Sequence, residues 1–261
     1  MQHRDAAAPH PEETLQTKEC NMWSKIFYFA MVPMVYAAFA VLIGGLLFKL
    51  AVVLFSKKFK GSLAAYPKRM PRPIGVPVEA FAVPVAWRKD KVLWVFIMAY
   101  HIAFFLLFIG HLELIREFKV LQVIPHQVFL GAGAVGIVLI VTVLYFLFRR
   151  FKSPWREISV PEDYLLLILL FLTMFLGSHL HLSARFYAGG GAFDIPVEAY
   201  REYLSSLLAF NPVVPAGIAD SPHYVIVALH IFLANLVLMM IPFSKVVHMV
   251  FTFLSLNLKR K

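Results

Sequence analysis

Five stretches of the chain are almost entirely apolar, and polar segments separate them. Each stretch reaches the ~20 residues that an α-helix needs to cross the ~30 Å hydrocarbon core of a bilayer. A continuous apolar run of this length favours a membrane-spanning helix over a buried helix of a soluble domain. The pattern therefore predicts an all-α membrane protein with five transmembrane helices. We expect them at residues 26–55, 92–112, 128–148, 164–182 and 223–253.

The remaining segments are too short to form a separate soluble domain. We expect a polar N-terminal segment at residues 1–25, a transmembrane domain at 26–255 and a basic tail at 256–261. Residues 195–210 carry charged and apolar side chains at helical spacing, which is typical of an amphipathic helix lying on the outer membrane surface. The first apolar stretch is too long for a cleaved signal peptide, so we expect it to remain as a helix.

Charged residues make up only 15% of the chain, against roughly 25% in an average soluble domain, which supports the membrane class. Their distribution predicts the orientation, because loops rich in Lys and Arg stay on the cytoplasmic side. Residues 149–163 hold four such side chains and the tail holds three, whereas the other two loops share four. The first connection holds Lys57, Lys58, Lys60, Lys68, Arg69, Arg72, Arg88, Lys89 and Lys91.

This asymmetry places the N-terminus outside and the C-terminus in the cytoplasm. It also explains most of the net charge of +10, so no nucleic-acid partner is needed to account for it. An acidic cytoplasmic partner is the alternative use of the same charge.

The single cysteine, Cys20, excludes several redox cofactors. The chain has no Cys-x-x-Cys-His motif for covalent haem and no set of four cysteines for an iron–sulfur cluster. It also lacks the glycine-rich motif of nucleotide-binding domains. Any redox cofactor in this chain is therefore expected to be held by histidine.

Four histidines lie within two of the apolar stretches, where an imidazole is costly unless it is paired or bound to a metal. His101 and His111 are ten residues apart, and His230 and His248 are eighteen apart. The predicted orientation puts His111 and His230 near the outside, and His101 and His248 near the inside. We therefore predict two bis-histidine haems b between the second and fifth helices.

Helical geometry allows both pairs to face a common interior. Ten residues turn a helix by about 280°, and eighteen residues return it to the same stripe. The separations along the axis differ, at about 15 Å against about 27 Å. Pro242 lies between His230 and His248, so we expect the fifth helix to be tilted or bent there. The competing interpretation is that these imidazoles only form hydrogen bonds between helices.

Other histidines are weaker candidates. His179 and His181 are two residues apart on a helix and point in nearly opposite directions, so they cannot both bind one metal. These two, His126 and His223 fall at the outer edge, where a polar role at the membrane interface is expected.

The C-terminal stretch carries a further motif: Leu229–Phe232 contains His230, and Ile241–His248 reads Ile-Pro-Phe-Ser-Lys-Val-Val-His. In this stretch the sequence resembles the respiratory nitrate reductase γ subunit family. The family's last helix likewise has a haem-binding His, seventeen intervening residues and a Pro-Phe-Ser-basic-x-Val-His ending. Gly110 and His111, with His101 ten residues earlier, resemble its second helix, and Gly131–Gly136 resembles the start of its third.

This resemblance implies a dihaem cytochrome b in the cytoplasmic membrane of a prokaryote. Such a subunit takes electrons from a quinol, here menaquinol, near the outer haem. It passes them through the inner haem to a cytoplasmic iron–sulfur subunit of a larger respiratory complex. The loop after the fourth helix resembles relatives found beside heterodisulfide-reductase-like proteins of sulfate reducers and methanogens, which would change the partner's substrate.

The family's quinol pocket lies beside the outer haem, with a basic residue just before the third helix. In this chain His126 occupies that place, and neutral imidazole can accept a proton from a quinol. Gly110 and His126 are therefore the candidate quinone-site residues, although His126 as a plain interfacial residue fits equally well. Two other functions stay open, namely a haem-free membrane anchor and a proton-transport subunit with a histidine relay.

Overall fold

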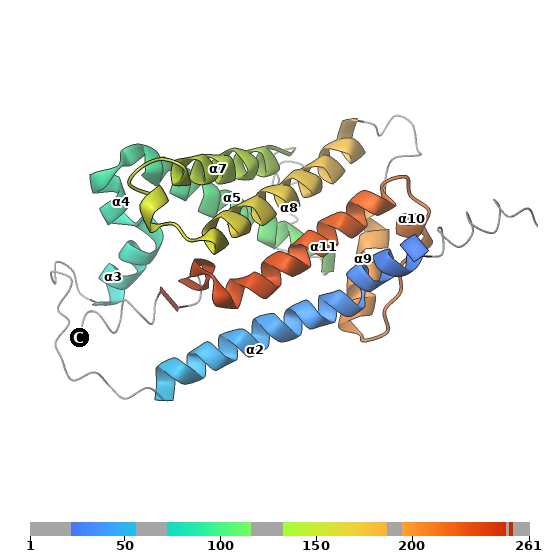
Figure 1. The fold of residues 1–261 in the computed structure, drawn as a ribbon. Helices are drawn as coiled ribbons and strands as arrows, with labels where there is room; N and C mark the ends of the chain where they lie inside the picture. Colours follow the sequence, from blue (N-terminus) through green and yellow to red (C-terminus); the bar gives the residue numbers. More distant parts are fainter. Residues whose placement is uncertain (1–21, 56–71, 116–132, 187–194, 249–250, 253–261) are drawn as a thin grey trace, which may run out of the picture.

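The computed structural model describes residues 22–55, 72–115, 133–186, 195–248 and 251–252 (Figure 1). Within these ranges every regular element is helical. Four helices are long and apolar enough to cross a membrane: Met22–Phe55, Lys91–Ile115, Pro161–Ser183 and Tyr224–Phe243. The described part of α7 (Ala134–Arg150) has 17 residues. Residues 128–132 of the stretch predicted there lie outside the described ranges.

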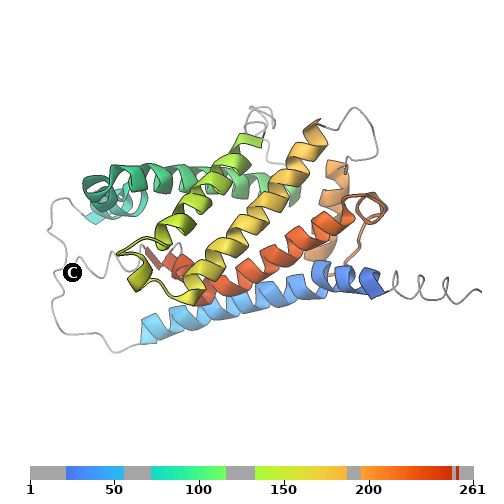
Figure 2. The ribbon, with the colours of Figure 1, turned by 45° about the horizontal axis from the view of Figure 1, so that its top comes forward.

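The bundle follows a simple order of neighbours. α5 (Lys91–Ile115) packs on α7, α7 on α8 (Pro161–Phe186), α8 on α11 (Tyr224–Met240), and α11 on α2 (Pro33–Phe55). Figure 2 shows these helices as an elongated bundle, in which α7 and α8 are inclined to α5 and α2. Leu139 and Val143 of α7 are fully buried between Ala103 of α5 and Met174 of α8. α7 therefore joins the two predicted helices 92–112 and 164–182, which lie within α5 and α8.

The two ends of the bundle carry different short elements. α4 (Pro84–Lys89) lies at one end with the last residues of α7, and α9 (Val197–Leu208) and α10 (Ala216–Ala219) lie at the other (Figure 1). We call these the α4 end and the α9 end. The first described helix begins at the α9 end and α11 finishes at the α4 end.

The first long helix is interrupted at Val32, because Pro33 has no backbone N–H to continue the hydrogen-bond ladder. Two side chains from distant elements bind carbonyls in this turn. Asn235 of α11 donates from Nδ2 to the Ala30 carbonyl at 2.9 Å, and the Tyr203 hydroxyl of α9 donates to the Met31 carbonyl. The turn is thus fastened to both α9 and α11.

α9 has the amphipathic character that residues 195–210 predict, but it is not a plain surface helix. Its Ala199, Tyr203 and Leu207 are buried in a cluster with Met31 and Ile218. The Tyr36 hydroxyl also donates to the Leu207 carbonyl at 2.9 Å. One face of α9 therefore closes the end of the bundle against the first helix, and the other face is exposed.

The connection before α5, expected as a basic loop, contains short helices in its described part. α3 (Arg72–Pro77) continues into the π-helical turn η1 (Val78–Ala82), and α4 follows after Val83, whose φ is 42°. Trp94 of α5 donates from Nε1 to the Ala82 carbonyl at 2.7 Å, which ties these turns to the bundle.

The predicted single helix at 223–253 is broken. α11 ends at Met240, and two 3₁₀ turns follow, η5 (Ile241–Phe243) and η6 (Lys245–Val247), separated by extended backbone at Ser244. The break occurs where a bend at Pro242 is expected, but it ends the helix. Pro242 is buried against Gly45 of α2, where a Cβ atom would lie 2.5 Å from the proline Cβ.

Candidate functional site

His101 of α5 and His248, which follows η6, lie next to each other. Their ring centroids are 6.2 Å apart and their planes are inclined by 67°. Two imidazoles that bind one metal ion from opposite sides, each at ~2 Å, have ring centroids about 6 Å apart. The spacing of these rings therefore fits a metal ion held between them, as in bis-histidine haem.

The four histidines predicted as ligands share one hydrogen-bond pattern. In each, Nδ1 lies 2.7–3.0 Å from a backbone carbonyl oxygen. A ring whose Nδ1–H donates to a carbonyl presents the lone pair of Nε2, which is the arrangement found in metal-binding histidines. The carbonyls that accept from His101, His111, His230 and His248 belong to Ile97, Leu107, Thr173 and Lys245, respectively.

His111 and His230 lie toward the α9 end. His111 is exposed near the end of α5, directly after the buried Gly110, whereas His230 is half-buried on α11. The contact between the rings of His101 and His248 joins α5 to the segment that follows α11.

Two residues of α8 complete the surroundings of His230, and neither was predicted from the sequence. The Thr173 carbonyl accepts the His230 Nδ1–H at 3.0 Å. At Gly177 a Cβ atom would lie 2.8 Å from Cε1 of the same ring. The only available signal was a glycine inside an apolar helix, which costs ~1 kcal/mol relative to alanine and therefore indicates close packing.

The sequence profile of the nitrate reductase gamma subunit family matches residues 87–260, which include all four of these histidines. The chain belongs to the nitrate reductase gamma subunit family. Members are haem-containing membrane cytochrome b subunits that transfer electrons within a nitrate reductase complex. The helix Met22–Phe55 precedes the matched residues. A search of curated proteins found no match to the chain.

The other histidines of this gamma-family chain are placed as follows. His126, the predicted quinone-site residue, lies outside the described residues. His179 of α8 and His223, at the start of α11, have ring centroids 5.9 Å apart. His181 lies beside Gly133. Gly133 has a φ of 95° and directly precedes α7.

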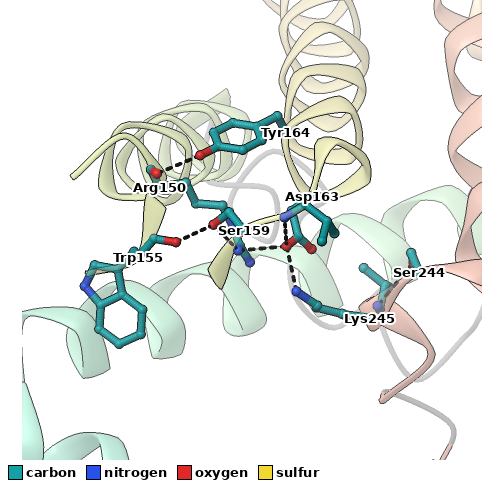
Figure 3. A network of polar contacts seen from close by, with 9 residues as sticks. Arg150, Trp155, Ser159, Asp163, Tyr164, Ser244 and Lys245 are labelled. Atoms are coloured by element: carbon teal, nitrogen blue, oxygen red, sulfur yellow. Dashed lines mark hydrogen bonds and ion pairs between the residues drawn. The ribbon is translucent and has the colours of Figure 1, made fainter. Parts of the chain in front are cut away.

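An ionic network centred on Asp163 lies at the α4 end of this gamma-family chain (Figure 3). Its carboxylate is 7% exposed and pairs through Oδ2 with Arg150 at 3.0 Å and Lys245 at 2.6 Å. The Val160 N–H also donates to this oxygen. Three segments that are distant in the sequence, the end of α7, the start of α8 and η6, therefore meet at one carboxylate.

The same end carries a second ion pair. Arg149 contacts Asp90 at 2.8 Å and lies 4.3 Å from the ring centroid of Trp155. Asp90 also accepts the Leu93 N–H at 2.9 Å and so caps the first turn of α5. The Leu93 N–H and the Arg149 guanidinium together hold the pKa of Asp90 below its ordinary value.

Proposed function

We propose that this chain is the dihaem cytochrome b subunit of a respiratory complex. His101 and His248 are the axial ligands of one haem b, and His111 and His230 are the ligands of the other. The observation that carries the proposal is the 6.2 Å separation of the His101 and His248 rings, each with Nδ1 bonded to a carbonyl. When bound, the haems supply one-electron transfer along the bundle.

Charge supports an orientation with the α4 end in the cytoplasm and the N-terminus outside. Most of the described Lys and Arg side chains gather at this end, and the positive-inside rule assigns such loops to the cytoplasm. This orientation requires an odd number of crossings, so α7 is the fifth transmembrane helix. His101 and His248 then hold the inner haem. The basic residues at the α4 end include Arg88, Lys89, Lys91, Arg149, Arg150, Lys152 and Arg156.

Electrons enter at the outer, α9 end and leave at the α4 end. A quinol, which we take to be menaquinol, binds near Gly110 and His111, with His126 as a candidate proton acceptor. Its oxidation delivers two electrons to the haems and two protons to the outside. The electrons leave through the inner haem to a cytoplasmic iron–sulfur subunit. That subunit docks on the basic surface at the α4 end of this chain.

The absorption spectrum of the purified full-length chain tests this proposal. A reduced-minus-oxidised spectrum should contain haem b bands, with two haems per chain. His101→Ala and His248→Ala should each lose the same haem, and His111→Ala and His230→Ala the other. The exposed His179→Ala is the matched control and should keep both.

The outcome also separates the alternatives. If the chain, purified from cells that supply haem in excess, contains no haem b, the proposal is wrong. The chain is then a membrane anchor or a proton-transport subunit with a histidine relay. Loss of the same haem in His101→Ala and in His230→Ala would overturn the pairing. A menaquinol analogue should still reduce the remaining haem of His101→Ala rapidly, and that of His111→Ala slowly.

A further inference from the structure

His230 differs from the other three candidate ligands in what holds its ring. His101, His111 and His248 each donate to a carbonyl three or four residues earlier in their own segment. The ring of His230 instead donates to the Thr173 carbonyl, across the interface between α11 and α8. Its position therefore depends on a second helix.

Gly177 explains how an imidazole reaches that carbonyl. In an α-helix the side chain of residue i+4 leans back over the turn that holds residue i. Gly177 is four residues after Thr173, so its missing side chain leaves the Thr173 carbonyl accessible from outside the helix. The His230 ring occupies this space: a Cβ atom at Gly177 would lie 2.8 Å from Cε1, 3.4 Å from Nδ1 and 3.6 Å from Nε2.

We propose that Gly177 and the Thr173 carbonyl form a seat on α8 that fixes the depth and plane of the His230 ring. The inference rests on the proposed function, in which His230 binds the outer haem. Gly177 is then a positioning residue of the outer haem. The seat would set the angle between the ring planes of His230 and His111, and the angle between two imidazole planes that bind one low-spin ferric haem governs its electron paramagnetic resonance spectrum.

Gly177→Ala tests the seat, with Gly44→Ala as the matched control, because a Cβ atom at Gly44 would have no neighbour within 4 Å. We expect Gly177→Ala to shift the ferric resonance and midpoint potential of the outer haem, or to lower its content at least about twofold. The inner haem signal should persist, which shows that the variant is folded. Unchanged outer signals in Gly177→Ala would overturn the inference.

A second measurement addresses the hydrogen bond and does not depend on the fold of Gly177→Ala. In His230→Gly, imidazole added from solution should restore the spectrum of the outer haem. 1-Methylimidazole can bind iron but has no N–H for the Thr173 carbonyl, so it should bind about 3- to 10-fold more weakly, as expected for one lost hydrogen bond. Equal binding of the two would overturn the role of the carbonyl.

The two hypotheses fail in different ways. A wild-type chain without haem contradicts the proposed function. If the wild-type chain holds two haems and the outer haem signals are the same in Gly177→Ala, only the inference about the seat is contradicted.

Discussion

The ammonium of Lys245 lies 2.6 Å from Oδ2 of Asp163, while the backbone carbonyl of Lys245 accepts the Nδ1–H of His248 at 2.9 Å. One residue thus connects the start of α8 to a candidate haem ligand. The side chain anchors the turn η6, and the main chain orients the imidazole. The basic position in the Pro-Phe-Ser-Lys sequence therefore has a structural role besides its charge.

Replacing Asp163 by asparagine should loosen this connection. The change removes the buried carboxylate that Arg150 and Lys245 share, although these two side chains are themselves 30% and 64% exposed, and should cost about 1–3 kcal/mol of stability. The inner haem should be lost at a lower temperature than the outer one. Thermal titration of the two haem signals in detergent measures both effects.

Glu162→Gln is the control for this change, because it removes the neighbouring carboxylate, which is exposed. It should leave both haems and the stability unchanged within about 0.5 kcal/mol. Equal behaviour of Asp163→Asn and Glu162→Gln would show that the network does not hold His248.

Gly45 and Gly44 are adjacent in α2 and should respond oppositely to alanine. A methyl group at Gly45 meets Pro242 at 2.5 Å, so Gly45→Ala should destabilise the protein by about 1–3 kcal/mol through overpacking. Gly44→Ala meets nothing and should be neutral or slightly stabilising, because alanine favours a helix. Thermal unfolding of both variants in detergent checks this, and similar melting temperatures would contradict the contact.

The length of the apolar stretches was sufficient to predict the four helices that are long enough to cross a membrane, because a bilayer imposes their length and composition. Chain direction and a rise of 1.5 Å per residue predict that His101 and His248 lie at one depth, and their ring centroids are 6.2 Å apart. The contact between Gly177 and His230 could not be predicted. A uniformly apolar sequence does not indicate how each helix is rotated about its axis or which helices are neighbours. The break after Met240 was only partly predictable, since Pro242 indicates an irregularity but not its size.

The turn before Pro33 should depend on its two distant donors. Asn235→Leu removes the hydrogen bond to the Ala30 carbonyl, with both residues buried, and should cost about 1–2 kcal/mol. Tyr203→Phe removes the bond to the Met31 carbonyl and should cost a similar amount.

The rate of limited proteolysis near Met22 measures how firmly the first helix is held by these two hydrogen bonds. Both variants should be cleaved faster than wild type at the first helix, while cleavage elsewhere stays the same. Wild-type cleavage rates in the double variant would show that neither bond holds the helix.

Acid should release the α5 cap at Asp90. The folded pKa of Asp90 is lowered, first by the Leu93 N–H and then by Arg149, so its contribution to stability is complete above about pH 4 and is lost as the pH falls through the folded value. Asp90→Ala should therefore be less stable than wild type at pH 7. The difference should shrink below about pH 4, as measured by thermal unfolding across pH.

Asp90→Asn separates the two causes of this shift. Asparagine can still cap the helix through its side-chain oxygen but forms no ion pair with Arg149. Its stability at pH 7 should lie between wild type and Asp90→Ala. Stability equal to that of Asp90→Ala would indicate that the ion pair, and not the cap, is the main contribution.

The attachment of the Pro33 turn also orders the assembly of the protein. Ribosomes synthesise the helix Met22–Phe55 first, yet Tyr203 and Asn235 lie 172 and 205 residues after the carbonyls that they bind. The first helix must therefore remain in the bilayer without its polar partners until α9 and α11 have been translated. Its docking follows the insertion of α11, so the α9 end closes only when that helix has entered the membrane.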